Sequence, residues 1–215
     1  MEALAHPRQR RKEARPAELM AAALELFVEK GFAGTRLDDV AARAGVSKGT
    51  LYLYFGSKEA LFKAVIQEGI VPILEEGAGL VDTFEGSTAD LLRALIGEWS
   101  QRIGNTHLAG VPKLMISEAG NFPDLAIYYH DAVIVRGRDL MRRTLQRGIA
   151  SGEFRAVDVE TAIDVIFAPV LLMVIWRHSL GLCCGARHDP QTYLQTHFDL
   201  TLNGILATNR PGTAS

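Results

Sequence analysis

The chain has 215 residues, of which 48% are hydrophobic and 22% are charged. This composition is typical of globular proteins and excludes a chain that is disordered throughout. The two cysteines, Cys183 and Cys184, are adjacent, which excludes a disulfide framework and a zinc site built from four thiolates. No secretory signal is recognisable, and the longest apolar run, 165–176, is too short to cross a bilayer. These features predict a cytoplasmic protein that does not enter a membrane.

Positive charge is concentrated at the N-terminal end. The formal net charge is −2, but residues 1–63 contain eleven Lys and Arg against eight Asp and Glu, whereas the remainder contains twelve against seventeen. A positive end on a negative body suits a protein that meets a polyanion with one end only.

The first predicted elements are a basic arm and two helices. Residues 1–15 are polar and basic and are expected to be disordered. Pro16 is a suitable first residue for a helix that ends at Gly31. Thr35, with Asp38 three positions later, predicts a capping box at the start of a short second helix.

A glycine turn then leads into a third short helix. Gly45 provides the turn, Ser47 is the expected N-cap, and Leu51 and Phe55 lie on the inward face. Two short helices joined by a tight turn and packed on a longer first helix form a helix-turn-helix. Residues 16–63 are therefore predicted to form a helix-turn-helix domain.

The remaining residues, 64–215, are also predicted to be helical. Gly69 and Pro72 predict a kink in the fourth helix, because proline has no N–H to donate. Later helices are expected over residues 87–103, 112–119, 123–150, 158–178 and 191–207, followed by a frayed tail at 208–215. The predicted fold class is all-α, with about nine helices.

The segment Gly31–Phe62 reads GFAGTRLDDVAARAGVSKGTLYLYFGSKEALF and resembles the DNA-binding signature of the TetR family of regulators. The match is almost continuous from Ala17 to Val65, and its core, AGVSKGTLY, is highly specific. The resemblance implies a homodimeric transcriptional regulator, more often a repressor than an activator. It implies a palindromic double-stranded DNA operator, a small-molecule effector and a C-terminal helical domain for effector binding and dimerisation. No cofactor or metal is implied.

Candidate DNA contacts lie at the N-termini of the second and third helices, where free N–H groups favour a phosphate and where a recognition helix meets base edges. Lys48 suits a guanine edge or a phosphate, and Gly49 lets the backbone approach the DNA. The family places phosphate contacts at positions matching Thr35, Tyr52, Tyr54 and Lys58. The candidate DNA contacts are Thr35, Arg36, Ser47, Lys48, Gly49, Thr50, Tyr52, Leu53, Tyr54 and Lys58.

Some of these residues have a second interpretation. Thr35 and Ser47 also suit simple helix caps, and Leu53 suits either a thymine methyl contact or plain exposure. The basic run Arg8–Arg15 suits an arm that follows the DNA or a solubilising tail.

Bulky residues of the middle helices suit either ordinary core or the wall of an apolar cavity for a mostly hydrophobic effector. The candidate effector-binding residues are Trp99, Ile103, His107, Met115, Phe122, Tyr128, Phe167 and Met173. The segment 165–176 is apolar all round and must be covered on every side. The candidate dimer contacts, on this helix and the last one, are Leu171, Ile175, His178, Tyr193, His197 and Leu200.

Two competing interpretations have less support from the sequence. The six histidines show no metal-ligand spacing, and no nucleophile elbow is present, so an enzyme is not expected. A dimeric binding protein that has lost operator recognition is disfavoured by the intact 48–52 segment.

The irregularity at Gly69 and Pro72 is a hypothetical element that couples effector binding to DNA binding, because the fourth helix joins the two domains.

Overall fold

The computed structural model describes residues 7–185 and 187–207, with side chains from residue 15 onward. Every named element in these ranges is a helix, and an isolated antiparallel bridge between Phe154 and Leu206 is the one strand-like pairing there. The predicted all-α fold class is confirmed. The tail prediction falls almost wholly outside the described residues, since 208–215 are not among them.

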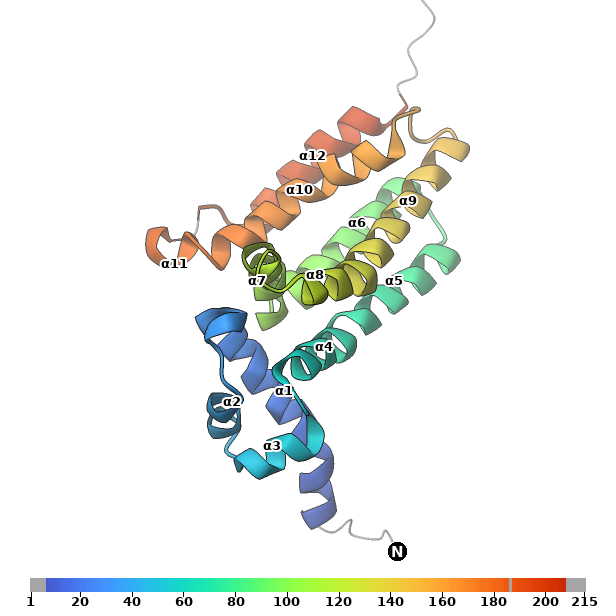
Figure 1. Ribbon diagram of the computed structural model, residues 1–215. Coiled ribbons are helices and arrows are strands. Elements are labelled where there is room, and N and C mark those ends of the chain that lie inside the picture. Colours follow the sequence, from blue (N-terminus) through green and yellow to red (C-terminus); the bar gives the residue numbers. More distant parts are fainter. Residues whose placement is uncertain (1–6, 186, 208–215) are drawn as a thin grey trace, which may run out of the picture.

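Three helices at one end of the molecule make up the helix-turn-helix unit, α1 (Pro7–Gly34), α2 (Leu37–Arg43) and α3 (Lys48–Tyr54) (Figure 1). The prediction that the first helix starts at Pro16 is wrong, because α1 already begins at Pro7 and the proline lies inside it. The residues before Pro16 are mostly Arg, Gln, Lys, Glu and Ala, which are good helix formers. The predicted disordered arm is therefore helical from Pro7, and its first six residues lie outside the described ranges.

The first helix is broken where the glycine signal predicts it. Gly31 has φ +78° and ψ 166°, a backbone conformation that side-chain-bearing residues avoid. One further turn follows, and α2 then begins at Leu37 with Arg36 as its N-cap residue. The capping box predicted at Thr35 is wrong, because the Thr35 hydroxyl is buried and donates to the carbonyls of Leu26 (3.0 Å) and Gly31 (2.8 Å).

The next two helices are separate rather than one kinked helix. α4 (Lys58–Gly69) and α5 (Val71–Thr83) meet at Ile70. Pro72 lies in the first turn of α5, where its missing N–H leaves no intrahelical bond unmade. The chain therefore breaks at the position predicted, but the proline begins a helix instead of bending one.

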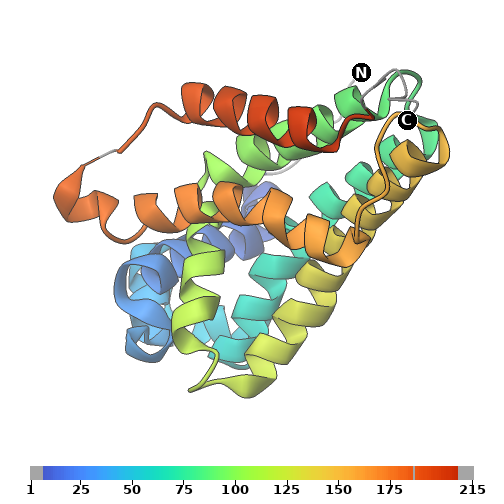
Figure 2. The ribbon, with the colours of Figure 1, turned by 90° about the horizontal axis from the view of Figure 1, so that it is seen from above.

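The C-terminal part contains the other helices, which Figure 2 shows from above. They are α6 (Thr88–Trp99), η1 (Ser100–Gly104), η2 (His107–Ala109), α7 (Gly110–Glu118), α8 (Pro123–Tyr129), η3 (His130–Ile134), α9 (Val135–Ala150), α10 (Val159–Arg177), α11 (Gly181–Cys184) and α12 (Pro190–Ile205). η1 and η3 are π-helical turns that continue α6 and join α8 to α9. The expected number of helices was lower, because α4 and α5 are separate and the one-turn α11 was not foreseen.

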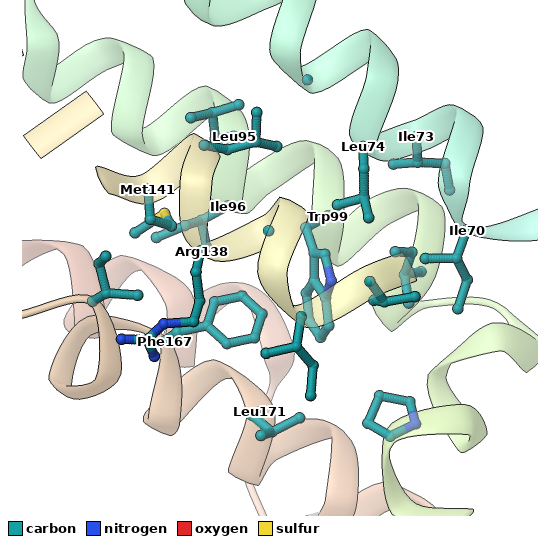
Figure 3. Close-up of a pocket in the computed structure, with 18 of the residues that line it drawn as sticks. Ile70, Ile73, Leu74, Leu95, Ile96, Trp99, Arg138, Met141, Phe167 and Leu171 are labelled. Carbon is teal, nitrogen blue, oxygen red and sulfur yellow. The ribbon is translucent and has the colours of Figure 1, made fainter. Parts of the chain in front are cut away.

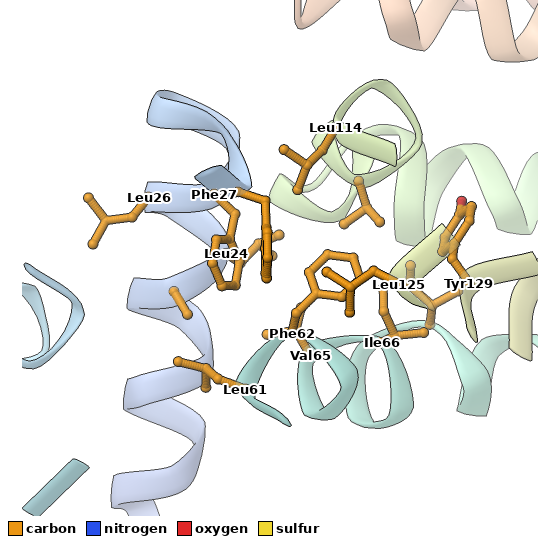
Figure 4. Close-up of a cluster of buried hydrophobic side chains, with 14 of the residues drawn as sticks. Leu24, Leu26, Phe27, Leu61, Phe62, Val65, Ile66, Leu114, Leu125 and Tyr129 are labelled. Carbon is orange, nitrogen blue, oxygen red and sulfur yellow. The ribbon is translucent and has the colours of Figure 1, made fainter. Parts of the chain in front are cut away.

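The larger hydrophobic core runs through both parts of the chain. Phe27, Phe32 and Phe62 from α1 and α4 pack with Leu114 and Leu125 from α7 and α8, and all five are buried (Figure 4). Full burial of such a side chain contributes about 1.5–3 kcal/mol. The helix-turn-helix unit is thus anchored in the C-terminal part rather than carried on a flexible linker.

The helix α10 is the one described helix that is long and apolar enough by length and composition to cross a membrane. Only 22% of its apolar window is buried inside the chain, and Val165 and Leu172 are 65% and 56% exposed. The single chain therefore leaves part of this helix uncovered, and the expectation that it is covered on every side, which includes a partner's helices, is not tested by one chain. The helices α7, α9 and α12 pack on α10, and the side that carries Val165 and Leu172 is exposed in the single chain.

The carboxylate of Glu153 closes the N-terminus of α6 from a distant loop. It accepts hydrogen bonds from the backbone N–H groups of Thr88 (2.6 Å) and Ala89 (2.8 Å), which have no intrahelical partner. Partial burial raises the pKa of this carboxyl, but the hydrogen bonds from the two N–H donors lower it by more. The net pKa therefore lies below its ordinary value.

We expect Glu153→Gln to lower the free energy of unfolding by about 1 kcal/mol at neutral pH, because a charged acceptor is lost from a helix N-terminus. A carboxyl with a lowered folded-state pKa stabilises the protein above its unfolded pKa, and this contribution is lost as the pH falls through the folded pKa. Urea unfolding of both proteins should therefore show a gap at pH 7 that narrows toward pH 3–4. A gap independent of pH would contradict the ionic contribution.

Candidate DNA-binding surface and ligand cavity

The helix α3 presents an exposed first turn, as the sequence predicts. Ser47 caps this helix, accepting a hydrogen bond from the Thr50 N–H at 3.1 Å, and its hydroxyl lies 2.9 Å from that of Thr50. Lys48 and Gly49 are exposed, and a Cβ built on Gly49 would approach only the Ser47 hydroxyl, at 3.8 Å. The glycine therefore leaves an open backbone at the place where base edges would lie.

The outward face of α3 continues through two exposed side chains. Tyr52 is 47% exposed and Leu53 is 84% exposed, whereas Leu51 is fully buried. Arg36 is exposed at the start of α2. Tyr54 is half-buried and packs against the core, as does Phe55, so their inward sides are structural.

Lys48 forms an ion pair in this structure. Its Nζ lies 2.8 Å from the Asp38 carboxylate of α2 and 5.9 Å from the centre of the Tyr52 ring. The hydrogen bond to Asp38 raises the pKa of the lysine. The side chain is 59% exposed, so exchanging this partner for a phosphate or a guanine edge requires no change in the fold.

Two predicted phosphate contacts have structural roles instead. The Thr35 hydroxyl is buried, with its hydrogen bonds made to α1. Lys58 Nζ donates to the carbonyls of Phe32 (2.6 Å) and Thr35 (3.1 Å). These carbonyls lie past the break in α1, where helical partners are missing, so the lysine acts as a cap in this structure, and its contact with DNA stays a prediction. The interpretation of Arg8–Arg15 as a DNA-following arm concerns side chains that are almost all outside the described ones.

The C-terminal part contains a cavity of about 730 Å³. Figure 3 shows side chains from α5, α6, α9 and α10 converging on it, with the Trp99 ring at its centre. Trp99 and Phe167 meet edge to face, with ring centres 5.0 Å apart. Of the predicted effector-binding residues, the cavity is lined by Trp99, Ile103, Met115 and Phe167.

The other four predicted effector-binding residues do not line the cavity. Phe122 packs on Phe32 (ring centres 4.7 Å apart), and Tyr128 lies over α4, with its hydroxyl 3.4 Å from the Lys63 carbonyl. His107 lies in η2, and Met173 is half-buried elsewhere on α10. The first two are bulky because they join the DNA-binding unit to α8, a role that their spacing along the sequence does not distinguish from cavity lining.

Most residues of the cavity wall were not predicted, although the helical spacing of these apolar residues is visible in the sequence. Ordinary amphipathic positions of α5, α6 and α9 supply it, including Ile70, Ile73, Leu74, Gly77, Leu95, Ile96, Leu140 and Met141. Leu171, predicted at the dimer contact, also lines it. Arg102 and Arg138 reach the rim, where Arg102 pairs with Glu76 and Arg138 pairs with Glu160 and Asp164. The interior is thus left almost wholly apolar.

Two more predicted dimer contacts are directed inward. His197 is 8% exposed, and burial lowers its pKa. The Tyr193 hydroxyl donates to the Pro169 carbonyl of its own chain at 3.0 Å. Both residues contribute to the packing of α12 on α10. Helical spacing alone does not distinguish such a contact within the chain from a contact with a partner subunit. Ile175 and His178 are half-buried, and Leu200 is 69% exposed.

Comparison with known proteins identifies the family. Residues 19–65 match the family described as "Bacterial regulatory proteins, tetR family", and residues 81–180 match "Tetracyclin repressor-like, C-terminal domain". The HTH-type transcriptional regulator YfiR of Bacillus subtilis is 39% identical over 165 residues, covering 73% of this chain and 76% of that protein. The chain belongs to the TetR family. It is a DNA-binding transcriptional regulator.

Solved structures share the fold over nearly the whole chain. FadR of Bacillus subtilis in complex with stearoyl-CoA superposes with a TM-score of 0.71 at 22% identity, covering 88% of this chain and 98% of that one. The ketosteroid regulator KstR2 of Mycobacterium tuberculosis gives 0.72 at 23% identity, covering 90% and 96%. At such identities the likeness concerns the fold alone.

We expect Lys48→Ala to weaken binding to a DNA duplex selected by the wild-type protein from a random library by about tenfold. If the lysine contacts a phosphate, the slope of log affinity against log salt should fall by about 1. If it reads a guanine, sequence preference should relax instead. Fluorescence anisotropy at several salt concentrations measures both.

Lys30→Ala is the matched control, because Lys30 makes a similar exposed pair with Asp39 (3.0 Å) but lies on α1. It should leave DNA affinity within twofold of wild type. Equal losses in the two variants would show that general charge, rather than the first turn of α3, carries the binding.

Proposed function

We propose that this regulator is a repressor that binds a palindromic operator as a homodimer and is released by a small, mostly apolar effector bound in the C-terminal cavity. The observation that carries the proposal is the mostly apolar cavity of about 730 Å³. Its walls include α7, which packs on α1, and α5, which packs on α4.

The cavity favours an apolar effector with a polar end. Its volume lies within the range of 300–1,000 Å³ that is usual for small-molecule sites. Its lining is mostly aliphatic and aromatic, and the charged side chains that also line it are half-buried or exposed, namely Glu76, Glu98, Arg102, Arg138 and Asp164. Related folds carry stearoyl-CoA in one protein and are named for a ketosteroid in another, and both molecules have a large apolar body.

A homodimer explains the uncovered side of α10 and α12. Val165 and Leu172 are seven residues apart on α10 and so lie on one face, and both are exposed, as is Leu200 on α12. In Figure 1 these two helices form an outer layer away from the DNA-binding unit. Two copies joined there by two-fold symmetry would present two α3 helices to a palindromic site.

Release from DNA requires that the effector prefer the protein conformation that binds DNA poorly. Ile70, at the break between α4 and α5, and Ile73 both line the cavity. A ligand that contacts them acts directly on the junction between the two parts of the chain. We therefore still propose that the irregularity at Gly69 and Pro72 couples the effector to DNA binding, with Ile70 as the residue that contacts the effector. Since the partner is DNA, we infer that the protein works in the cytoplasm.

We expect at least one of stearoyl-CoA, stearate and cholest-4-en-3-one to stabilise the protein and to release the selected DNA. At a ligand concentration of 100 times Kd the stabilisation is about 2.7 kcal/mol, which raises Tm by roughly 5–10 °C. Gly137→Leu should abolish both effects, because Gly137 lines the cavity and the added side chain would take up space needed by the ligand; a Cβ there would meet only Leu74, at 4.0 Å.

Gly137→Ala, which adds one methyl group, is the control and should keep both effects. Stabilisation that survives in Gly137→Leu would place the ligand elsewhere. If none of the three probes shifts Tm or DNA release, the proposed effector class is wrong.

We expect Leu172→Glu to convert the dimer to monomer and to weaken operator binding more than tenfold, since a buried unpaired carboxylate is costly. Light scattering after size-exclusion chromatography measures the mass. Ile127→Glu is the control: Ile127 is 60% exposed but lies on α8. A Leu172→Glu protein that stays dimeric would move the interface away from α10.

A further inference from the structure

The segment Gly31–Thr35, here called the α1–α2 joint, links the long part of α1 to α2 and so bears on where α2 and α3 lie relative to α1. The helical backbone is interrupted at Gly31. Backbone groups beside such a break lose their helical partners and need others. Whatever supplies those partners also holds α2 and α3 in place.

Three side chains supply them. Two come from the DNA-binding unit: the Thr35 hydroxyl donates to the Gly31 carbonyl, and Lys58 donates to the carbonyls of Phe32 and Thr35. The third, Glu118, comes from the last turn of α7. Its Oε1 accepts the Ala33 N–H at 3.2 Å, across 85 positions of the sequence.

Glu118 is inserted into the joint. The residue is only 8% exposed, and its Oε1 would lie 2.9 Å from a Cβ on Gly31. The second carboxylate oxygen accepts from the side-chain amide of Asn121 at 3.3 Å. Four residues after Glu118, Phe122 packs against Phe32. The C-terminal end of α7 therefore holds the joint by a polar bond beside an aromatic contact.

The same turn of α7 forms part of the cavity wall. Met115 and Ala119, three residues before Glu118 and one after it, both line the cavity, as do Pro112 and Ile116. A helical turn moves as a unit, so an effector that displaces Met115 or Ala119 also displaces Glu118. The carboxylate lies between the effector and the α1–α2 joint.

We propose that Glu118 is a positioning residue that couples cavity occupancy to the setting of α2 and α3. This inference rests on the proposed function, since it concerns regulation by the same cavity. With the cavity empty, the bond to Ala33 holds the joint. When the cavity is filled, α7 moves, and either the joint follows it or the bond breaks.

The hydrogen bond between Ala33 and Glu118 favours two discrete positions of α7 over a continuous range of positions. A buried carboxylate that loses an N–H donor keeps its desolvation cost, and the freed N–H adds its own. Intermediate positions of α7 are therefore unfavourable, and packed interfaces of this kind switch between discrete arrangements. This route through α7 and α1 is distinct from the break at Ile70 on α4 and α5.

The test compares Glu118→Met with Glu118→Gln. Methionine fills a similar volume without a strong acceptor for the Ala33 N–H, whereas glutamine keeps a carbonyl oxygen for it, and Asn121 can turn its own oxygen toward the new amide. Circular dichroism and Tm check that both variants fold. Each is combined with Gly137→Leu, which places an apolar side chain at the cavity wall without any added ligand, and with Gly137→Ala as the matched control.

The readout is the ratio of the Kd for selected DNA in the Gly137→Leu form to that in the Gly137→Ala form. We expect a ratio on the order of tenfold in the wild-type background and nearly as large with Glu118→Gln. With Glu118→Met it should fall to within about twofold of 1. Stearoyl-CoA titrated into the Gly137→Ala forms provides a second, ligand-driven comparison.

An unchanged ratio with Glu118→Met would overturn the inference and leave the proposed function intact. Equal losses with Met and Gln would show that charge or packing, not the bond to Ala33, carries the coupling, and would also overturn it. A ratio near 1 in the wild-type background, with no release by stearoyl-CoA, would contradict regulation through the cavity itself, and the inference with it.

Discussion

The shared aromatic core is the constraint on which the rest of the structure depends. Phe27, Phe32 and Phe62 make mutual ring contacts at 5.3–5.8 Å, and Phe122 from the C-terminal part closes on Phe32 at 4.7 Å. Close-packed interiors transmit displacement because they leave few voids in which to absorb it. The DNA-binding unit therefore packs directly on helices that surround the cavity. A displacement of the cavity wall can reach the DNA-binding helices without passing through a flexible linker.

The helix-turn-helix was predictable because its signals are local. A glycine that needs positive φ, a serine that caps the next helix and an inward leucine each depend on a few neighbouring residues, and Gly31, Ser47 and Leu51 behave as predicted. The structural roles of Thr35 and Lys58 could not be predicted, because their partners are backbone carbonyls left free by the break in α1. A break in a helix leaves backbone carbonyl groups without partners, and a residue pattern does not indicate where this happens. Nearby polar side chains then donate hydrogen bonds to these carbonyls.

The cavity was only half predictable for a different reason. Helical spacing identifies an apolar face but not what that face meets, so Phe122 and Phe167 look alike in the sequence although one packs on the DNA-binding unit and the other on Trp99 inside the cavity. The same ambiguity affected α12, where His197 and Tyr193 face their own chain. Glu118 illustrates the opposite case, since a lone glutamate near a helix end reads as solvent-exposed until tertiary structure buries it.

The uncovered face of α10 has a consequence for the amount of protein as well as for its shape. In the proposed dimer, pairing covers Val165, Leu172 and Leu200, so the stability of the chain would rise with its own concentration by mass action. In the proposed dimer, pairing also assembles the unit that recognises both half-sites. At low abundance, occupancy of the operator then varies with the square of the number of chains, which makes synthesis and dilution of the regulator a second input beside the effector.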